Sequence, residues 1–188
     1  MNANAYKAQG RSDNDLAMTP MWLIRQLESL TRLTISLDVC CSAETARAPT
    51  YFDEDFDALS QSWKTGPLAS GLGAAWMNPP FSKATKFVSY ASEEARNGAI
   101  VIGCVKDAPD VDWYQEFVER EAIVIYKPTS RVNFLKPDGS VFMYLNKRTG
   151  KMEKSSANFP ICFPIWTPIR TGQPAQIIRF KLDPTFGN

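Results

Sequence analysis

The fold is decided by the stretch Ala74-Ala75-Trp76-Met77-Asn78-Pro79-Pro80-Phe81. Its first four residues form an apolar run, which is typical of the buried carboxyl end of a parallel strand. In open α/β sheets, ligands bind just beyond the carboxyl ends of the strands. The stretch therefore predicts a buried strand that leads directly into a functional loop.

The loop after this strand is stiffened by two consecutive prolines, Pro79 and Pro80. They fix φ and remove two backbone donors, so the carbonyl groups of the loop stay free to accept hydrogen bonds. Asn78 adds a carboxamide and Phe81 adds a flat apolar ring. Together these residues offer acceptors for an exocyclic amine and a stacking surface for a planar base, as methylation of the amino group of adenine requires. An ordinary Asn-Pro turn with Phe81 in the core is the alternative.

The flanking sequence alternates between helical and strand patterns. Thr19-Pro20 predicts a helix start, because it combines an N-cap residue with proline at the first helical position. The expected elements are a helix at 20–31, a strand at 33–39, a tight turn and short helix within 40–49, a helix at 87–96 closed by Gly98, a strand at 99–105, a helix at 111–120, a strand at 122–126, a hairpin with one arm at 141–145 and a turn near 149–150, and a last strand at 161–166.

Strands that alternate with helices up to about residue 126 predict an α/β protein with a doubly wound sheet. We expect helices on both faces of this sheet and an antiparallel C-terminal hairpin added to it. Residues 1–14 are polar and patternless and are expected to form a flexible N-terminal arm. Residues 15–188 then form a single domain, in which residues 136–158 are a basic hairpin insertion.

The chain of 188 residues contains no histidine. This excludes Ser-His and Cys-His nucleophilic machinery and histidine metal sites. The four cysteines show no C-x-x-C spacing, so we expect neither a metal site nor a disulfide framework. No apolar run reaches membrane-spanning length, and a reducing cytoplasm is the simplest expectation. Methyl transfer from a sulfonium stays open, because such a cofactor carries its own activated leaving group.

Charge is distributed unevenly along the chain. Residues 122–181 contain ten basic residues and two acids, a local charge of +8, whereas the whole chain carries +1. A basic C-terminal third beside an acidic remainder suits a polyanion that is bound on one side. A solvated surface with chance asymmetry is the alternative.

In these features the chain resembles the small phage-type DNA adenine-N6 methyltransferases, the Dam-like family. The resemblance covers much of residues 15–166, and Asn-Pro-Pro-Phe is its sharpest motif. The matching positions are Asp15, Thr19-Pro20, Leu37-Asp38-Val39, Tyr51-Phe52, Leu59, Trp63, Trp76-Met77-Asn78-Pro79-Pro80-Phe81, Trp113, Arg131, Phe134 and Phe159-Pro160. The chain departs in two features from larger methyltransferases. The loop after Asp38 is poor in glycine, and few residues separate Asp38 from Met77 in the sequence.

The resemblance implies a class I, Rossmann-like methyltransferase fold that binds S-adenosylmethionine in the cytoplasm of a bacterium or an infected host cell. An acid at the strand end could pair with the ammonium group of the cofactor, while turn amides face its carboxylate. Another acid would meet the ribose or the adenine. The implied cofactor residues are Thr19, Pro20, Asp38, Cys40, Ser42, Asp57 and Asn78.

The resemblance also implies methyl transfer to the exocyclic amino group of adenine in double-stranded DNA. The Asn78 oxygen and the Pro79 carbonyl would accept both amino protons and so localise the lone pair of the nitrogen. Phe81 would stack on the flipped base. Arg131 would contact a base or phosphate near the adenine. The implied contacts to the DNA backbone come from Lys147, Arg148, Lys151 and Lys154.

Three other functions fit the same tetrapeptide. Methyltransferases that act on RNA bases or on protein glutamine need a similar carboxamide geometry. A methyltransferase fold kept as a non-catalytic nucleic-acid-binding module is also open, with the unusual Cys40-Cys41 loop as its signature. The basic C-terminal third favours nucleic acid over protein.

Overall fold

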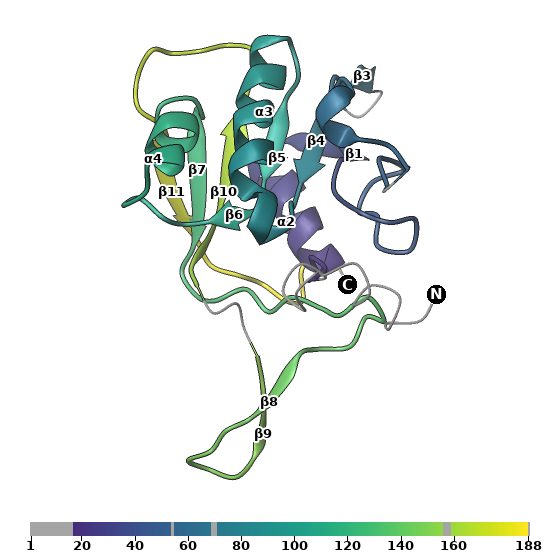
Figure 1. Cartoon of the computed structure of the whole chain (residues 1–188), viewed down its shortest axis with the longest axis vertical. Coiled ribbons are helices and arrows are strands. Elements are labelled where there is room, and N and C mark those ends of the chain that lie inside the picture. The colour runs from purple at the N-terminus through teal and green to yellow at the C-terminus, as the bar shows by residue number, and fades with distance from the viewer. Residues whose placement is uncertain (1–16, 54, 69–70, 156–158, 188) are drawn as a thin grey trace.

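The computed structural model of the chain describes residues 17–53, 55–68, 71–155 and 159–187 (Figure 1). The N-terminal arm expected at 1–14 lies outside the described residues. No helix in these ranges is long and apolar enough to cross a membrane.

The described chain alternates helical segments and strands up to a projecting hairpin, after which it forms two further strands. The helical segments are α2 (Met21–Thr31), η2 (Ala58–Ser60), η3 (Phe81–Lys83), α3 (Ala84–Arg96), α4 (Asp112–Tyr114) and η4 (Gln115–Glu119). The strands are β1 (Leu33–Asp38), β2 (Thr50–Tyr51), β3 (Pro67–Leu68), β4 (Gly71–Met77), β5 (Val101–Gly103), β6 (Val105–Lys106), β7 (Val124–Pro128), β8 (Met143–Leu145), β9 (Met152–Lys154), β10 (Ile161–Trp166) and β11 (Gln176–Phe180).

The central sheet is mostly parallel and runs in the order β11-β7-β10-β5-β4-β1-β2. The pairs β1–β2, β1–β4, β4–β5 and β7–β11 are parallel, whereas β10 is antiparallel to both of its neighbours. From β1 the chain continues outward to β2, while β4 and β5 lie on the other side of β1. The strand order therefore reverses between β1 and β4, which is where open α/β sheets bind ligands.

Helices cover both faces of the sheet, as expected from the alternation of elements. Leu23, Ile24 and Leu27 of α2 pack on one face, in a core that also holds Trp76 and Phe163. Val88, Ala91 and Ala95 of α3 pack on the other face with the buried Trp63 and Trp166. These side chains are apolar at helical spacing, which is why the sequence pattern predicted both helices correctly.

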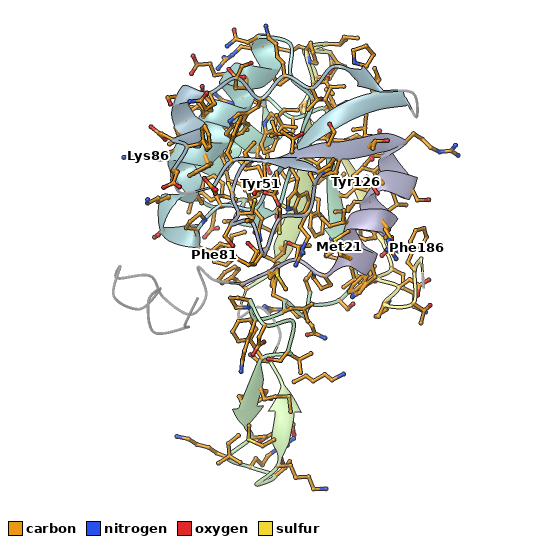
Figure 2. All side chains as sticks on the ribbon, turned by 90° about the vertical axis from the view of Figure 1, so that its right-hand side faces the viewer. Met21, Tyr51, Phe81, Lys86, Tyr126 and Phe186 are labelled. Atoms are coloured by element: carbon orange, nitrogen blue, oxygen red, sulfur yellow. The ribbon has the colours of Figure 1, made fainter. Side chains whose placement is uncertain are left out.

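The antiparallel part differs from the prediction. The hairpin β8–β9 forms a two-stranded sheet of its own, projects away from the body and precedes two further strands (Figures 1 and 2). The antiparallel addition to the central sheet is instead β10, which is inserted between β5 and β7. All six residues of β10 are buried, so the strand requires neighbours on both sides. The expected last strand is therefore an interior strand, and β11 was not predicted.

Three local predictions also need correction. In the described structure, residues 40–49 contain turns and bends and no helix, because the Asp38 carboxylate binds backbone N–H groups of this loop. The single strand expected at 99–105 is split into β5 and β6 at Cys104. The helix expected at 111–120 consists of the single turn α4 followed by η4, a π-helical segment.

Gly103 offers a stability test of the sheet core. A Cβ at Gly103 would lie 2.8 Å from the ring of Trp166 and 3.0 Å from Cε of Met77, both fully buried. We expect Gly103→Ala to lower the free energy of unfolding by about 1–3 kcal/mol through overpacking. The control Gly66→Ala meets nothing within 4 Å. Urea denaturation of both variants checks the prediction, and equal stability would contradict this packing.

Candidate active site

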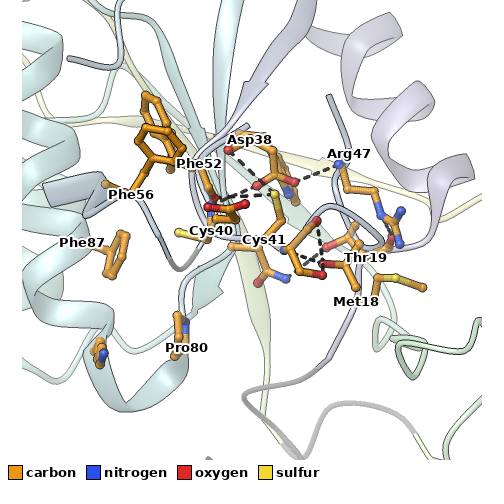
Figure 3. A pocket seen from close by; sticks show the side chains of 18 of the residues that line it. Met18, Thr19, Asp38, Cys40, Cys41, Arg47, Phe52, Phe56, Pro80 and Phe87 are labelled. Atoms are coloured by element: carbon orange, nitrogen blue, oxygen red, sulfur yellow. Dashed lines mark hydrogen bonds between the residues drawn. The ribbon is translucent and has the colours of Figure 1, made fainter. Parts of the chain in front are cut away.

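A cavity of about 410 Å³ opens where β1 and β4 end, at the reversal of strand order (Figure 3). Its volume is in the range of small-molecule sites, about 300–1,000 Å³. The side chains that end these strands face it together with the 17–19 segment. Its lining comprises Ala17, Met18, Thr19, Asp38, Val39, Cys40, Cys41, Ser42, Thr45, Arg47, Phe52, Asp53, Phe56, Asp57, Ala58, Trp76, Asn78, Pro80, Lys83, Phe87 and Pro137.

Asp38 is the buried acid of this cavity, with 2% of its surface exposed. Its Oδ1 accepts the backbone N–H of Cys40 at 3.1 Å and its Oδ2 accepts the backbone N–H of Arg47 at 2.9 Å. Burial raises the pKa of Asp38 to about 6, and these two hydrogen bonds and the Arg47 charge oppose the rise. Each oxygen can accept a further bond, so the carboxylate can still bind a cation.

Asn78 follows β4 and lies at the rim of the same cavity. Its Nδ2 donates to the Ala17 carbonyl and to the Thr19 hydroxyl, each at 3.3 Å. These two bonds use both amide protons, and no donor among the described residues reaches Oδ1. The side-chain oxygen is therefore held in place with its acceptor capacity free. Pro80 also lines the cavity, whereas Pro79 is buried and is not among the lining residues.

Phe81 lies outside the cavity, at the first residue of η3. Its ring meets the ring of Phe159 edge to face, with centroids 4.6 Å apart and an interplanar angle of 87°. Lys106 lies over Phe159, with Nζ 5.6 Å from the ring centroid. A base that stacks on Phe81 would therefore also meet Phe159, which the sequence analysis placed only in the family pattern.

Most of the residues expected to contact the cofactor line this one cavity. Thr19, Cys40, Ser42 and Asp57 do so, together with Asp38 and Asn78. Pro20 does not; it is buried and immediately precedes α2. Asp57 is exposed and caps η2 by accepting the Leu59 N–H at 3.2 Å.

The two cavity cysteines are neutral thiols. Burial, followed by the negative charge of Asp38, raises the pKa of both Cys40 and Cys41. The thiolate is the nucleophilic form of cysteine, so neither residue is activated for covalent catalysis.

Several lining residues were not identified as site residues from the sequence. Phe52, Phe56 and Phe87 form an aromatic side of the cavity, opposite Arg47 and Thr19 (Figure 3). Phe56 is 56% exposed, and its ring centroid lies 6.4 Å from that of Phe52, so the two rings extend the apolar side of the cavity to the surface. Arg47 lies in a run of mostly small residues, and no local sequence pattern indicates that it belongs to a binding site.

The residues expected to bind DNA lie elsewhere. The structure places Lys147 and Arg148 in the turn of the β8–β9 hairpin, Lys151 just before β9 and Lys154 at its end, all exposed. Arg131 is also exposed and does not line the cavity.

Comparison with known proteins identifies the family of the chain. A sequence profile of the family described as DNA N-6-adenine-methyltransferase (Dam) matches residues 7–181. The DNA N-6-adenine-methyltransferase of Haemophilus phage HP1 is 24% identical over 126 residues, which cover 66% of this chain and 69% of the phage protein. No solved structure shows a significant match. The chain thus belongs to the Dam family of DNA adenine-N6 methyltransferases, and it is an adenine-specific DNA methyltransferase.

The raised pKa of Asp38 predicts a pH-dependent stability. A carboxyl whose pKa rises from 3.8 to about 6 on folding holds its proton more tightly when folded. Its contribution to stability is present at low pH and is lost as the pH rises through 6. Between pH 4.5 and 7.5, wild type without ligand should lose about 2 kcal/mol of unfolding free energy relative to Asp38→Asn. Urea denaturation measures the unfolding free energy of both proteins across this pH range. Profiles that run parallel for wild type and Asp38→Asn would contradict the raised pKa of Asp38.

Proposed function

We propose that this DNA adenine methyltransferase takes its methyl group from S-adenosylmethionine bound in the cavity between β1 and β4, and that Asn78 activates the adenine amine. The observation that carries the proposal is the free side-chain oxygen of Asn78, fixed at the rim of the cavity by two hydrogen bonds. A sheet that reverses its strand order at this cavity supports the class I, Rossmann-like assignment.

The cavity residues fit the parts of this cofactor. When bound, S-adenosylmethionine supplies an activated methyl group on a sulfonium. Asp38 would hold the ammonium group of its methionine part, with Thr19, Cys40 and Ser42 around it. Phe52 and Phe56, 6.4 Å apart between ring centroids, would contact the adenine ring. Asp57 would accept the hydroxyl groups of the ribose. All of these residues line the cavity.

Asn78 and Pro79 would prepare the amino group for attack. The lone pair of this nitrogen is delocalised into the adenine ring, which makes it a poor nucleophile. Hydrogen bonds from both amino protons to the Asn78 oxygen and the Pro79 carbonyl favour a pyramidal nitrogen with a localised lone pair. Because Thr19 and Ala17 already orient the carboxamide, this acceptor is preorganised and needs no reorganisation during the reaction. Phe81 would stack on the flipped base.

The projecting hairpin would bind the DNA. The segments on both sides of the hairpin lie near the site. Pro137, which precedes the hairpin, lines the cavity, and Phe159, which follows it, contacts Phe81. Duplex held by the hairpin would therefore lie beside Asn78. Arg131 would contact a base or a phosphate near the flipped adenine.

Two basic residues of the C-terminal third form ion pairs within the protein. Lys127 forms an ion pair with Asp107 at 2.8 Å, and Arg170 forms one with Glu121 at 2.7 Å. The four cations of the hairpin, by contrast, are exposed and form no ion pair with another described residue. Two of the ten positive charges of this third are thus engaged within the protein, and four of the other eight lie on the hairpin.

The proposed reaction is tested with S-adenosylmethionine labelled in its methyl group. The protein is incubated with duplex DNA, RNA or a protein mixture, and the products are hydrolysed to nucleosides or amino acids. We expect label in N6-methyldeoxyadenosine from DNA. Label in RNA bases or in glutamine would support one of the alternative substrates, and no transfer at all would support a non-catalytic binding module.

Removal of the amine acceptor should stop catalysis without preventing cofactor binding. We expect Asn78→Ala to lower turnover far more than tenfold, while calorimetry shows nearly unchanged affinity for S-adenosylhomocysteine. A variant that keeps more than about a tenth of wild-type turnover, a loss below ~1.4 kcal/mol, would contradict the acceptor role.

Removal of the hairpin charges should flatten the salt dependence of DNA binding. Each residue that neutralises a phosphate contributes about one unit to the slope of log affinity against log salt. The variant with Lys147, Arg148, Lys151 and Lys154 all replaced by Ala should therefore lose up to about four units. The control Lys64→Ala/Lys86→Ala, which removes two exposed cations elsewhere, should keep the wild-type slope. An unchanged slope in the hairpin variant would place the DNA on another surface.

A further inference from the structure

Arg47 is the cation that lies closest to the buried acid of the cavity. Its backbone N–H donates to Oδ2 of Asp38 at 2.9 Å, which fixes the base of the side chain. Its Nε donates to the Thr19 carbonyl, and its Nη1 lies 3.4 Å from the Ala46 carbonyl. Among the described residues, no acceptor is found for Nη2. Figure 3 shows the guanidinium beside Thr19, on the polar side of the cavity.

The methionine part of the proposed cofactor carries its ammonium and its carboxylate on the same carbon atom. If Asp38 holds the ammonium, the carboxylate must bind within a few ångströms of it. The amides of the Cys40–Ser42 turn are poorly available for this purpose. Cys40 donates its N–H to Asp38, and Ser42 donates its N–H to the Thr45 hydroxyl at 2.9 Å. Two of the three turn amides thus have an acceptor within the loop.

The charges that line the cavity leave few candidates for an anion. Asp38, Asp53 and Asp57 are acids, and the basic residues that line it are Arg47 and Lys83. Lys83 belongs to η3, which follows Pro80, whereas Arg47 is hydrogen-bonded to Asp38 through its own backbone. A guanidinium presents its N–H groups in a fixed fork that matches the two oxygens of a carboxylate.

We propose that Arg47 binds the carboxylate of the cofactor's methionine part, an inference that rests on the proposed function. Asp38 and Arg47 then form a matched pair of opposite charges for the two charged groups on one carbon. The same guanidinium holds the Thr19 carbonyl, and the Thr19 hydroxyl accepts from Asn78. The carboxylate site is therefore directly connected to the segment that orients the amine acceptor.

Two ligands that differ only in this carboxylate test the proposal by calorimetry, without any turnover. They are S-adenosylhomocysteine and its decarboxylated analogue. Wild type should prefer S-adenosylhomocysteine by about 10- to 100-fold, as expected for a charge-assisted hydrogen bond. Arg47→Met should bind the two ligands about equally, close to the affinity of wild type for the decarboxylated analogue. The control Lys83→Met should keep the wild-type preference.

Arg47→Lys provides a second test that keeps the charge but loses the fork. This variant should retain only part of the preference for S-adenosylhomocysteine, with unchanged affinity for the decarboxylated analogue. It remains decisive if thermal melting shows that Arg47→Met does not fold. A wild-type preference in both Arg47 variants, or no preference in wild type, would overturn the proposal. Wild type that binds neither ligand would instead reject the proposed cofactor itself, and the Arg47 assignment with it.

Discussion

The parallel pairing of β1 with β4 is the constraint on which the site depends. Asp38 is the register partner of Trp76, and the Val39 N–H donates to the Trp76 carbonyl at 3.0 Å. Because both strands end at the same edge of the sheet, this register places the buried acid after β1 beside the carboxamide after β4. A shift by one residue would turn every side chain of β1 to the opposite face and remove Asp38 from the cavity.

The site is built from hydrogen bonds and fixed charges in a chain without histidine. Asp38 organises the loop after β1, Arg47 of that loop holds the 17–19 segment, and this segment orients Asn78. Each of these three hydrogen bonds joins residues from different parts of the sequence. The raised pKa values of Cys40 and Cys41 keep these neighbours of Asp38 neutral, so the negative charge of this loop is that of the Asp38 carboxylate. Such an arrangement suits a reaction in which the leaving group is already activated and the protein supplies position and electrostatics.

The sequence predicted those elements whose pattern is local. The apolar spacing of Leu23 and Leu27 and the alternation of residues 33–39 correctly indicated α2 and β1, and the run before Asn78 indicated β4. The interior position of β10 was missed because strand order depends on pairing between distant segments. Arg47 was missed because its role follows from contacts to Asp38 and Thr19, 9 and 28 residues away. The helix expected within 40–49 failed for the same reason, since Asp38 captures the amides that a helix would use.

A crystal structure of the protein with S-adenosylhomocysteine would test whether the cavity between β1 and β4 binds the cofactor beside Asn78. We expect the ligand to fill the cavity, with its sulfur between Asp38 and the Asn78 oxygen and its adenine ring on the side of Phe52 and Phe56. The Asn78 amide should still donate to Ala17 and Thr19. A ligand bound outside the cavity, or an Asn78 side chain turned so that its oxygen faces Thr19, would contradict the account.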